Sequence, residues 1–88
     1  MAVRPSSSQS PRAMKLQALE RCLRGAMADL ALVNKHISRQ LQLVVELEQS
    51  GQDAKIARIF LEEAEAVRTV YMADAARLEE QVGQRRAA

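Results

Sequence analysis

The stretch HISRQLQLVVELEQSGQD, residues 36–53, decides the fold, because one long helical pattern ends within it. Apolar residues recur every three or four positions up to this point, as they do on one face of an α-helix. Ser50 and Gly51 then interrupt the pattern, and glycine suits the left-handed conformation that ends many helices. Asp53 follows at a position suited to capping a second helix. We therefore predict two helices joined by a turn at residues 50–53.

The outer boundaries of the two helices are also marked in the sequence. Ser10 offers a capping hydroxyl, and Pro11 after it lacks only an N–H that the first helical position does not use. At the other end, Gly83 is the predicted helix stop. Four serines and a proline leave the first ten residues little to bury, so these residues are expected to be disordered. The predicted organisation is a disordered tail (1–10), a helix (11–49), a turn (50–53), a helix (54–82) and a flexible C-terminal tail (83–88).

Composition supports an all-α class. The 88 residues allow one small domain. Hydrophobic residues make up 48 % of the chain but aromatic residues only 2 %, so the apolar positions are filled mainly by strong helix formers and other aliphatic residues. No stretch alternates apolar and polar residues as a half-buried strand does.

Each predicted helix carries a seam of residues at heptad spacing, in which only a few members are polar. In residues 11–49 the seam consists of Leu16, Leu19, Leu23, Ala26, Leu30, Val33, Ile37, Gln40, Val44 and Leu47. In residues 54–82 we expect Ala57, Phe60, Ala64, Val67, Tyr71, Asp74, Leu78 and Gln81. Gln40 and Asp74 are polar residues within mainly apolar seams, and we interpret them as residues that set the register.

Folding the chain about Gln52 makes the two seams face each other. This register places Val44 opposite Phe60 and Ile37 opposite Val67, with facing residue numbers adding to 104. Large residues then often oppose small ones, as interdigitating helices require. The predicted fold is an antiparallel two-helix hairpin that resembles a coiled coil.

Apolar residues remain outside both seams, and they predict self-association. Burying them would require two hairpins to pair into a four-helix bundle, as a homodimer, or a helical protein partner. We therefore expect a non-enzymatic protein–protein interaction or regulatory module. The candidate interface residues are Met27, Leu41, Val45, Ile56, Ile59, Leu61 and Val70.

His36 is the only histidine and the one candidate for chemistry. The positions three and four residues away hold no good metal ligand, so no metal site is predicted. Cys22 lies fourteen residues away, about 21 Å along a helix axis, which is too far for a nucleophilic pair. A hairpin that dimerises and presents a histidine on its first helix is also the arrangement of two-component phosphotransfer elements. The alternative function is therefore histidine phosphotransfer at His36; no catalytic, cofactor or small-molecule site is otherwise predicted.

Charge and cysteine content bound the remaining classes. The net charge of +2 does not by itself indicate nucleic acid, but a folded hairpin would have an acidic turn and a basic open end. Weak nucleic-acid binding at the basic end is the third function considered, and it lacks aromatic residues for stacking. No apolar run approaches the ~18 residues of a membrane span. The single cysteine, Cys22, excludes an intrachain disulfide and fits a cytoplasmic location.

Residues 36–82 resemble a group of short, uncharacterised bacterial proteins. The shared pattern is His-Ile-x-x-Gln, an apolar pair, Leu-Glu, Gly and Asp, and later an Asp-x-x-Arg-Leu stretch. The matching positions here are His36, Ile37, Gln40, Leu47, Glu48, Gly51, Asp53, Asp74, Arg77 and Leu78. The resemblance implies a helical hairpin of bacterial origin and implies no activity.

Overall fold

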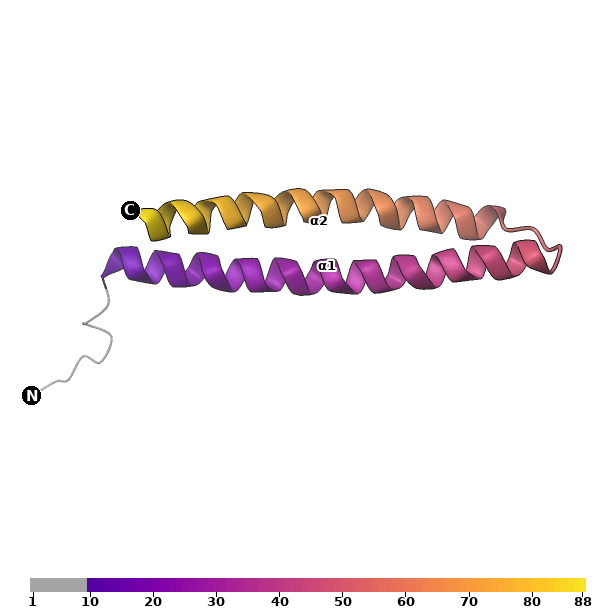
Figure 1. Ribbon diagram of the computed structural model, residues 1–88, viewed down its shortest axis with the longest axis horizontal. Coiled ribbons are helices and arrows are strands. Elements are labelled where there is room, and N and C mark those ends of the chain that lie inside the picture. The colour runs from indigo at the N-terminus through magenta and orange to yellow at the C-terminus, as the bar shows by residue number, and fades with distance from the viewer. Residues whose placement is uncertain (1–9) are drawn as a thin grey trace, which may run out of the picture.

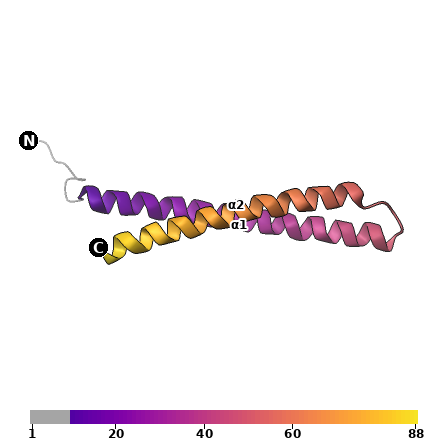
Figure 2. The same cartoon turned by 90° about the horizontal axis from the view of Figure 1, so that it is seen from above.

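The protein is a hairpin of two antiparallel helices (Figure 1). The computed structural model describes residues 10–88, in which α1 spans Pro11–Gln49 and α2 spans Lys55–Ala87. The helices run side by side for their whole shared length and cross near the middle (Figure 2). The predicted all-α hairpin is thus confirmed. The predicted disordered tail falls, except for Ser10, outside the described residues.

The N-terminus of α1 is capped as predicted. The Ser10 Oγ accepts a hydrogen bond of 3.1 Å from the Ala13 N–H, and Pro11 occupies the first helical position. The hydroxyl therefore satisfies one of the four N–H groups that a helix start leaves without a partner.

The C-terminus of α1 ends in a left-handed glycine, also as predicted. Gly51 has a φ of 75°, and its N–H donates to the Glu48 carbonyl at 3.1 Å. The Gln52 N–H donates to the Leu47 carbonyl at 2.8 Å. These two bonds form a Schellman motif, which turns the chain and satisfies carbonyls that the helix end exposes.

The start of α2 differs by one residue from the expectation. Ala54, rather than Asp53, occupies the N-cap position, and its carbonyl accepts the first helical bond from the Arg58 N–H at 2.9 Å. Asp53 still contributes, because its Oδ1 accepts a hydrogen bond of 2.9 Å from the Lys55 N–H. The carboxylate therefore stabilises the helix start from the residue before the cap.

The predicted end of α2 at Gly83 is wrong. The helix continues through Gly83 to Ala87, so residues 83–87 are helical and do not form a flexible tail. Val82, just before the glycine, is only 4 % exposed, and Arg86, just after it, forms an ion pair with Glu20 of α1. Contacts on both sides of Gly83 thus outweigh the roughly 1 kcal/mol that glycine costs inside a helix.

The seam of α1 lies where the sequence places it. All ten predicted positions, from Leu16 to Leu47, are buried or half-buried, and Ile37 and Val44 are the most enclosed. The heptad pattern of the first helix is therefore confirmed.

The seam of α2 is only half right. Ala57, Ala64, Tyr71 and Leu78 are buried or half-buried as predicted, but Phe60 is 51 % exposed and Val67 is 41 % exposed. At each of the other predicted positions, the residue that lies in the seam is instead the next one along the chain. The seam of α2 consists of Ala54, Ala57, Leu61, Ala64, Arg68, Tyr71, Ala75, Leu78, Val82 and Arg85.

The register of the hairpin is correspondingly different from the predicted one. Val44 packs in a core cluster with Ala54 and Ala57, against which Leu47 and Leu61 also pack. Val44 thus faces Ala57 instead of Phe60. Stepping by heptads from this cluster, facing residue numbers add to 101, a shift of three residues from the predicted register.

Two ion pairs at opposite ends show that this register runs through the whole hairpin. Glu48 pairs with Arg58 near the turn, and Glu20 pairs with Arg86 near the open end. The two glutamates are four heptads apart on α1, and the two arginines are four heptads apart on α2. Equal spacing on both helices requires an unbroken heptad register between the two pairs.

The core between the helices is narrow. The buried residues are Ile37, Val44, Ala54, Ala57, Ala64, Ala75 and Val82, and most of these are alanines. Within residues 10–88, neither helix contains an apolar stretch long enough to cross a membrane.

Candidate interaction surface

One side of the hairpin is predominantly apolar where it flanks the seam. Leu43 and His36 lie one heptad apart on α1, and Phe60 and Val67 lie one heptad apart on α2. Residues at heptad spacing share one side of a helix, so each pair forms a short row beside the seam. We call this the Phe60 side; it also includes Glu63, and at its outer margin Leu32, Arg39, Ile56 and Val70, each three or four residues from a member of the two rows.

A shallow groove of about 490 Å³ lies between the two rows. Its walls come from both helices, and most of them are apolar. Three polar side chains, His36, Gln40 and Glu63, lie among them. The groove is lined by Val33, His36, Gln40, Phe60, Glu63, Ala64 and Val67.

Toward the open end the Phe60 side becomes acidic. Asp29 and Asp74 continue the two rows by one heptad each, and they line a small hollow together with Ala26 and Tyr71. The Asp74 carboxylate accepts a hydrogen bond of 2.9 Å from Arg77 on the same helix. The apolar part of this side is thus confined to the half of the hairpin nearer the turn.

The opposite side of the seam is charged at both ends. We call it the ion-pair side, because the pairs Glu48–Arg58 and Glu20–Arg86 lie on it. The positions between these pairs alternate in character along each helix. At heptad spacing they are Met27, Asn34 and Leu41 on α1, and Glu65, Met72 and Glu79 on α2.

The structure separates the interface candidates predicted from sequence. Ile56 and Val70 lie on the Phe60 side, whereas Met27, Leu41 and Val45 lie on the ion-pair side. Ile59 lies near the turn, where it lines a pocket with Glu48 and Arg58. All six are exposed, so each remains available for a contact with another molecule.

Leu61 is a correction to that list. It is half-buried and packs against the cluster of Val44, Ala54 and Ala57. Its place in the seam follows from the register, which assigns Leu61 the position that the sequence analysis gave to Phe60. Leu61 is therefore a core residue of the hairpin and is not available to a partner.

His36 is exposed and lines the groove of the Phe60 side. Glu63, from the other helix, lines the same groove. The sequence around His36 contains no acidic neighbour, so the proximity of this carboxylate is visible only in the folded chain.

The two polar seam residues have different surroundings. Asp74 is half-exposed and bonded to Arg77, while its neighbour Ala75 takes the seam position and is 3 % exposed. Its expected role as a seam residue is therefore wrong. Gln40 does lie in the seam, and its Oε1 is buried without a hydrogen-bond partner among residues 10–88.

No cluster of three metal-ligating side chains is found in the described part of the chain. Cys22 is exposed and unpaired. At the open end, the continuation of α2 brings Arg85 close to Arg12 and Lys15, and the three line one pocket. The expected basic open end thus includes residues from both helices.

The surface residues that sequence reasoning missed are Phe60 and Val67, both of which line the groove. Their spacing from the other apolar residues of the second helix predicts a place in the seam. The available signal was the heptad spacing that links Leu61, Arg68, Ala75 and Val82 to the rest of the α2 seam.

No family model, curated protein or solved structure matches this chain. The resemblance of residues 36–82 to short bacterial hairpin proteins stays a prediction.

Proposed function

We propose that this chain is a non-enzymatic interaction module, a helical hairpin that self-associates into a four-helix bundle and so docks on or regulates another protein. The observation that carries the proposal is the exposure of Phe60 and Val67 on one side of the hairpin. Both lie beside a groove lined mainly by apolar side chains. Burying such side chains stabilises a complex by about 25 cal/mol per Å² of apolar surface.

The narrow core supports the same proposal. No large side chain is fully buried within residues 10–88, and alanines fill most of the enclosed positions. A two-helix hairpin has only one interface in which to bury apolar surface, whereas a bundle of four helices has a shared core. Pairing would therefore supply burial that one hairpin lacks.

The direct test is sedimentation equilibrium at tens of micromolar. We expect a species of about twice the chain mass of 9.8 kDa. Phe60→Gln should shift the equilibrium toward monomer, since it removes the largest exposed apolar side chain on the Phe60 side. Ile59→Gln is the matched control, because Ile59 is exposed next to Phe60 in sequence but does not line the groove. A folded wild type that stays monomeric would refute the proposal.

Histidine phosphotransfer is the second candidate, and the position of His36 favours it. The imidazole is exposed and shares the groove with the carboxylate of Glu63, a group suited to positioning a histidine N–H. Incubation with a labelled low-molecular-weight phosphodonor or with host kinases would test it. Acid-labile label on the wild type that is lost in His36→Ala supports this function, and an unlabelled wild type rejects it.

Nucleic-acid binding is the third candidate, because Arg12, Lys15 and Arg85 meet at the open end. Phosphate contacts of this kind weaken steeply as salt rises. Fluorescence anisotropy with a labelled duplex, with and without Arg12→Gln and Lys15→Gln, would reveal them.

We assign the module to a bacterial cytoplasm, where a reducing environment keeps the exposed Cys22 from cross-linking chains.

A further inference from the structure

The groove on the Phe60 side is lined by one carboxylate, that of Glu63, among mainly apolar side chains. Glu63 takes part in none of the ion pairs of the described residues. A carboxylate accepts strong hydrogen bonds from charged donors. A molecule that fills this groove should therefore carry a cationic hydrogen-bond donor as well as apolar side chains.

Arg39 is a donor of the required kind at the margin of the same groove. It follows His36 by three residues, which places it on the same side of α1. It is exposed and forms no ion pair with any residue from 10 to 88. A guanidinium has five N–H donors and no acceptor, and it bonds carboxylates in a two-pronged geometry.

Arg39 and Glu63 lie at the same level of the hairpin on different helices. The seam register places Ile37 opposite Ala64 and Gln40 opposite Leu61. Arg39 lies between the first members of these two pairs on α1, and Glu63 lies between the second members on α2. A half-turn about the long axis of the hairpin exchanges the positions of α1 and α2. A second copy rotated in this way presents its Glu63 to Arg39 and its Arg39 to Glu63, as a twofold interface requires.

The same rotation also matches apolar residues. Leu32 and Val70 lie at one level on the outer margins of the Phe60 side. Leu32 of each copy would therefore face Val70 of the other. Phe60 and Val67 from both chains would then lie between the two grooves. The apolar contacts and the charged contacts thus select one orientation, with the two turns at the same end.

We propose that the Phe60 side binds a second copy of this chain, turn beside turn, and that Arg39 of each chain bonds Glu63 of the other. This inference rests on the self-association proposed above and adds its face and orientation. The proposed orientation places two acidic turns near each other. At physiological salt the Debye length is about 8 Å, so dissolved ions weaken the repulsion between charges spread over the two turns. They weaken the attraction of a pair in direct contact much less.

Mixing two charge-reversed chains tests the reciprocal contact. Arg39→Glu alone and Glu63→Arg alone each create two repulsive contacts per homodimer, so each should weaken self-association about tenfold or more. In a one-to-one mixture, both contacts of the heterodimer are again between opposite charges. The mixture should therefore associate within about threefold of the wild-type dissociation constant.

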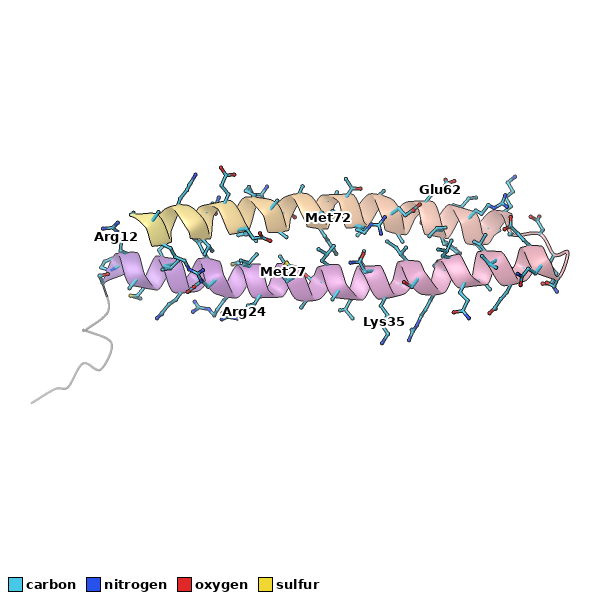
Figure 3. All side chains as sticks on the ribbon, viewed as in Figure 1. Arg12, Arg24, Met27, Lys35, Glu62 and Met72 are labelled. Carbon is cyan, nitrogen blue, oxygen red and sulfur yellow. The ribbon has the colours of Figure 1, made fainter. Side chains whose placement is uncertain are left out.

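Lys35→Glu and Glu62→Arg are the matched controls. Both residues are exposed, each is close in sequence to a tested residue, and both point away from the opposite helix (Figure 3). These variants should associate as the wild type does, alone and mixed. Orientation is checked by Gln52→Cys in a Cys22→Ser background, which should form a disulfide-linked dimer only if the turns are adjacent.

Each outcome separates this inference from the function on which it rests. A wild-type dimer whose charge-reversed chains do not recover on mixing would overturn the assigned face while leaving self-association in place. Recovery in the Arg39→Glu/Glu63→Arg double variant but not in the mixture would show a contact within one chain, and would likewise overturn it. A folded, monomeric wild type would overturn both proposals and leave the groove to a helix of another protein.

Discussion

Val44 of α1 packs against Ala57 of α2, and Phe60, one helical turn further along, lies outside the core. This relationship fixes the register of the hairpin. It also determines which side chains remain exposed, because the α2 residues displaced from the seam include the large apolar side chains of Phe60 and Val67. Phe60 and Val67 become surface residues beside a groove for the same reason that Leu61 and Arg68 enter the seam.

Cysteine cross-linking distinguishes the two registers. In a Cys22→Ser background, the pairs Val44→Cys/Ala57→Cys and Ile37→Cys/Ala64→Cys should oxidise readily to intrachain disulfides. Phe60 lies about 4.5 Å further along the helix axis than Ala57 and outside the seam, so 44/60 should link slowly. The same holds for 37/67. Faster oxidation at 44/60 and 37/67, measured by mass and gel mobility, would restore the register that places Phe60 in the core.

The first helix and the turn were predictable from sequence because their signals are local. Ser10, Pro11 and Gly51 act through hydrogen bonds and φ values within a few residues of themselves. The α1 seam was predictable because almost every member is apolar. These features depend on no contact with the second helix.

The second seam was not predictable by the same reasoning because its apolar pattern is ambiguous. Heptad steps from Phe60 lead to Val67, Asp74 and Gln81, whereas heptad steps from Leu61 lead to Arg68, Ala75 and Val82. Burial depends instead on the rotation of α2 about its own axis, which the turn sets. This rotation places Ala54 beside Val44. Arg68 can be half-buried in the seam because its long aliphatic stem packs while its charged end reaches solvent.

Enlarging Ala75 should destabilise the hairpin. Ala75 is the most enclosed residue described, at 3 % exposure, so Ala75→Leu overfills the seam and should lower the free energy of unfolding by about 1–3 kcal/mol. Ala73→Leu, at an exposed position of the same helix, should change it by less than about 0.5 kcal/mol. Chemical denaturation followed by circular dichroism measures both. Equal effects of the two substitutions would contradict the seam assignment of Ala75.

Substitutions at Gly83 test whether α2 continues to Ala87. No atom lies within 4 Å of a Cβ built at Gly83, and its φ is not positive, so Gly83→Ala should stabilise the helix by up to about 1 kcal/mol. Gly83→Pro removes an interior N–H and clashes with the preceding turn, so it should destabilise by up to about 3 kcal/mol.

Gly83→Ala should therefore raise both the helical ellipticity and the denaturation midpoint, whereas Gly83→Pro should lower both. If residues 83–88 formed a flexible tail, both variants would unfold as the wild type does. Gly51→Ala serves as a contrast, because alanine is strained at a φ of 75° and should destabilise although the space around it is open.

Replacing Gln40 should stabilise the hairpin. Among residues 10–88 the buried Gln40 Oε1 has no hydrogen-bond donor, which costs about 1–3 kcal/mol. Gln40→Leu, made in a Phe60→Gln background to suppress pairing, should therefore raise the free energy of unfolding by a similar amount. Gln42→Leu in the same background is the control, since Gln42 is exposed and its side chain bonds Glu46 of its own helix. Chemical denaturation of the Phe60→Gln chain with and without each substitution measures both effects. A less stable Gln40→Leu hairpin would mean that Gln40 is already satisfied within one chain.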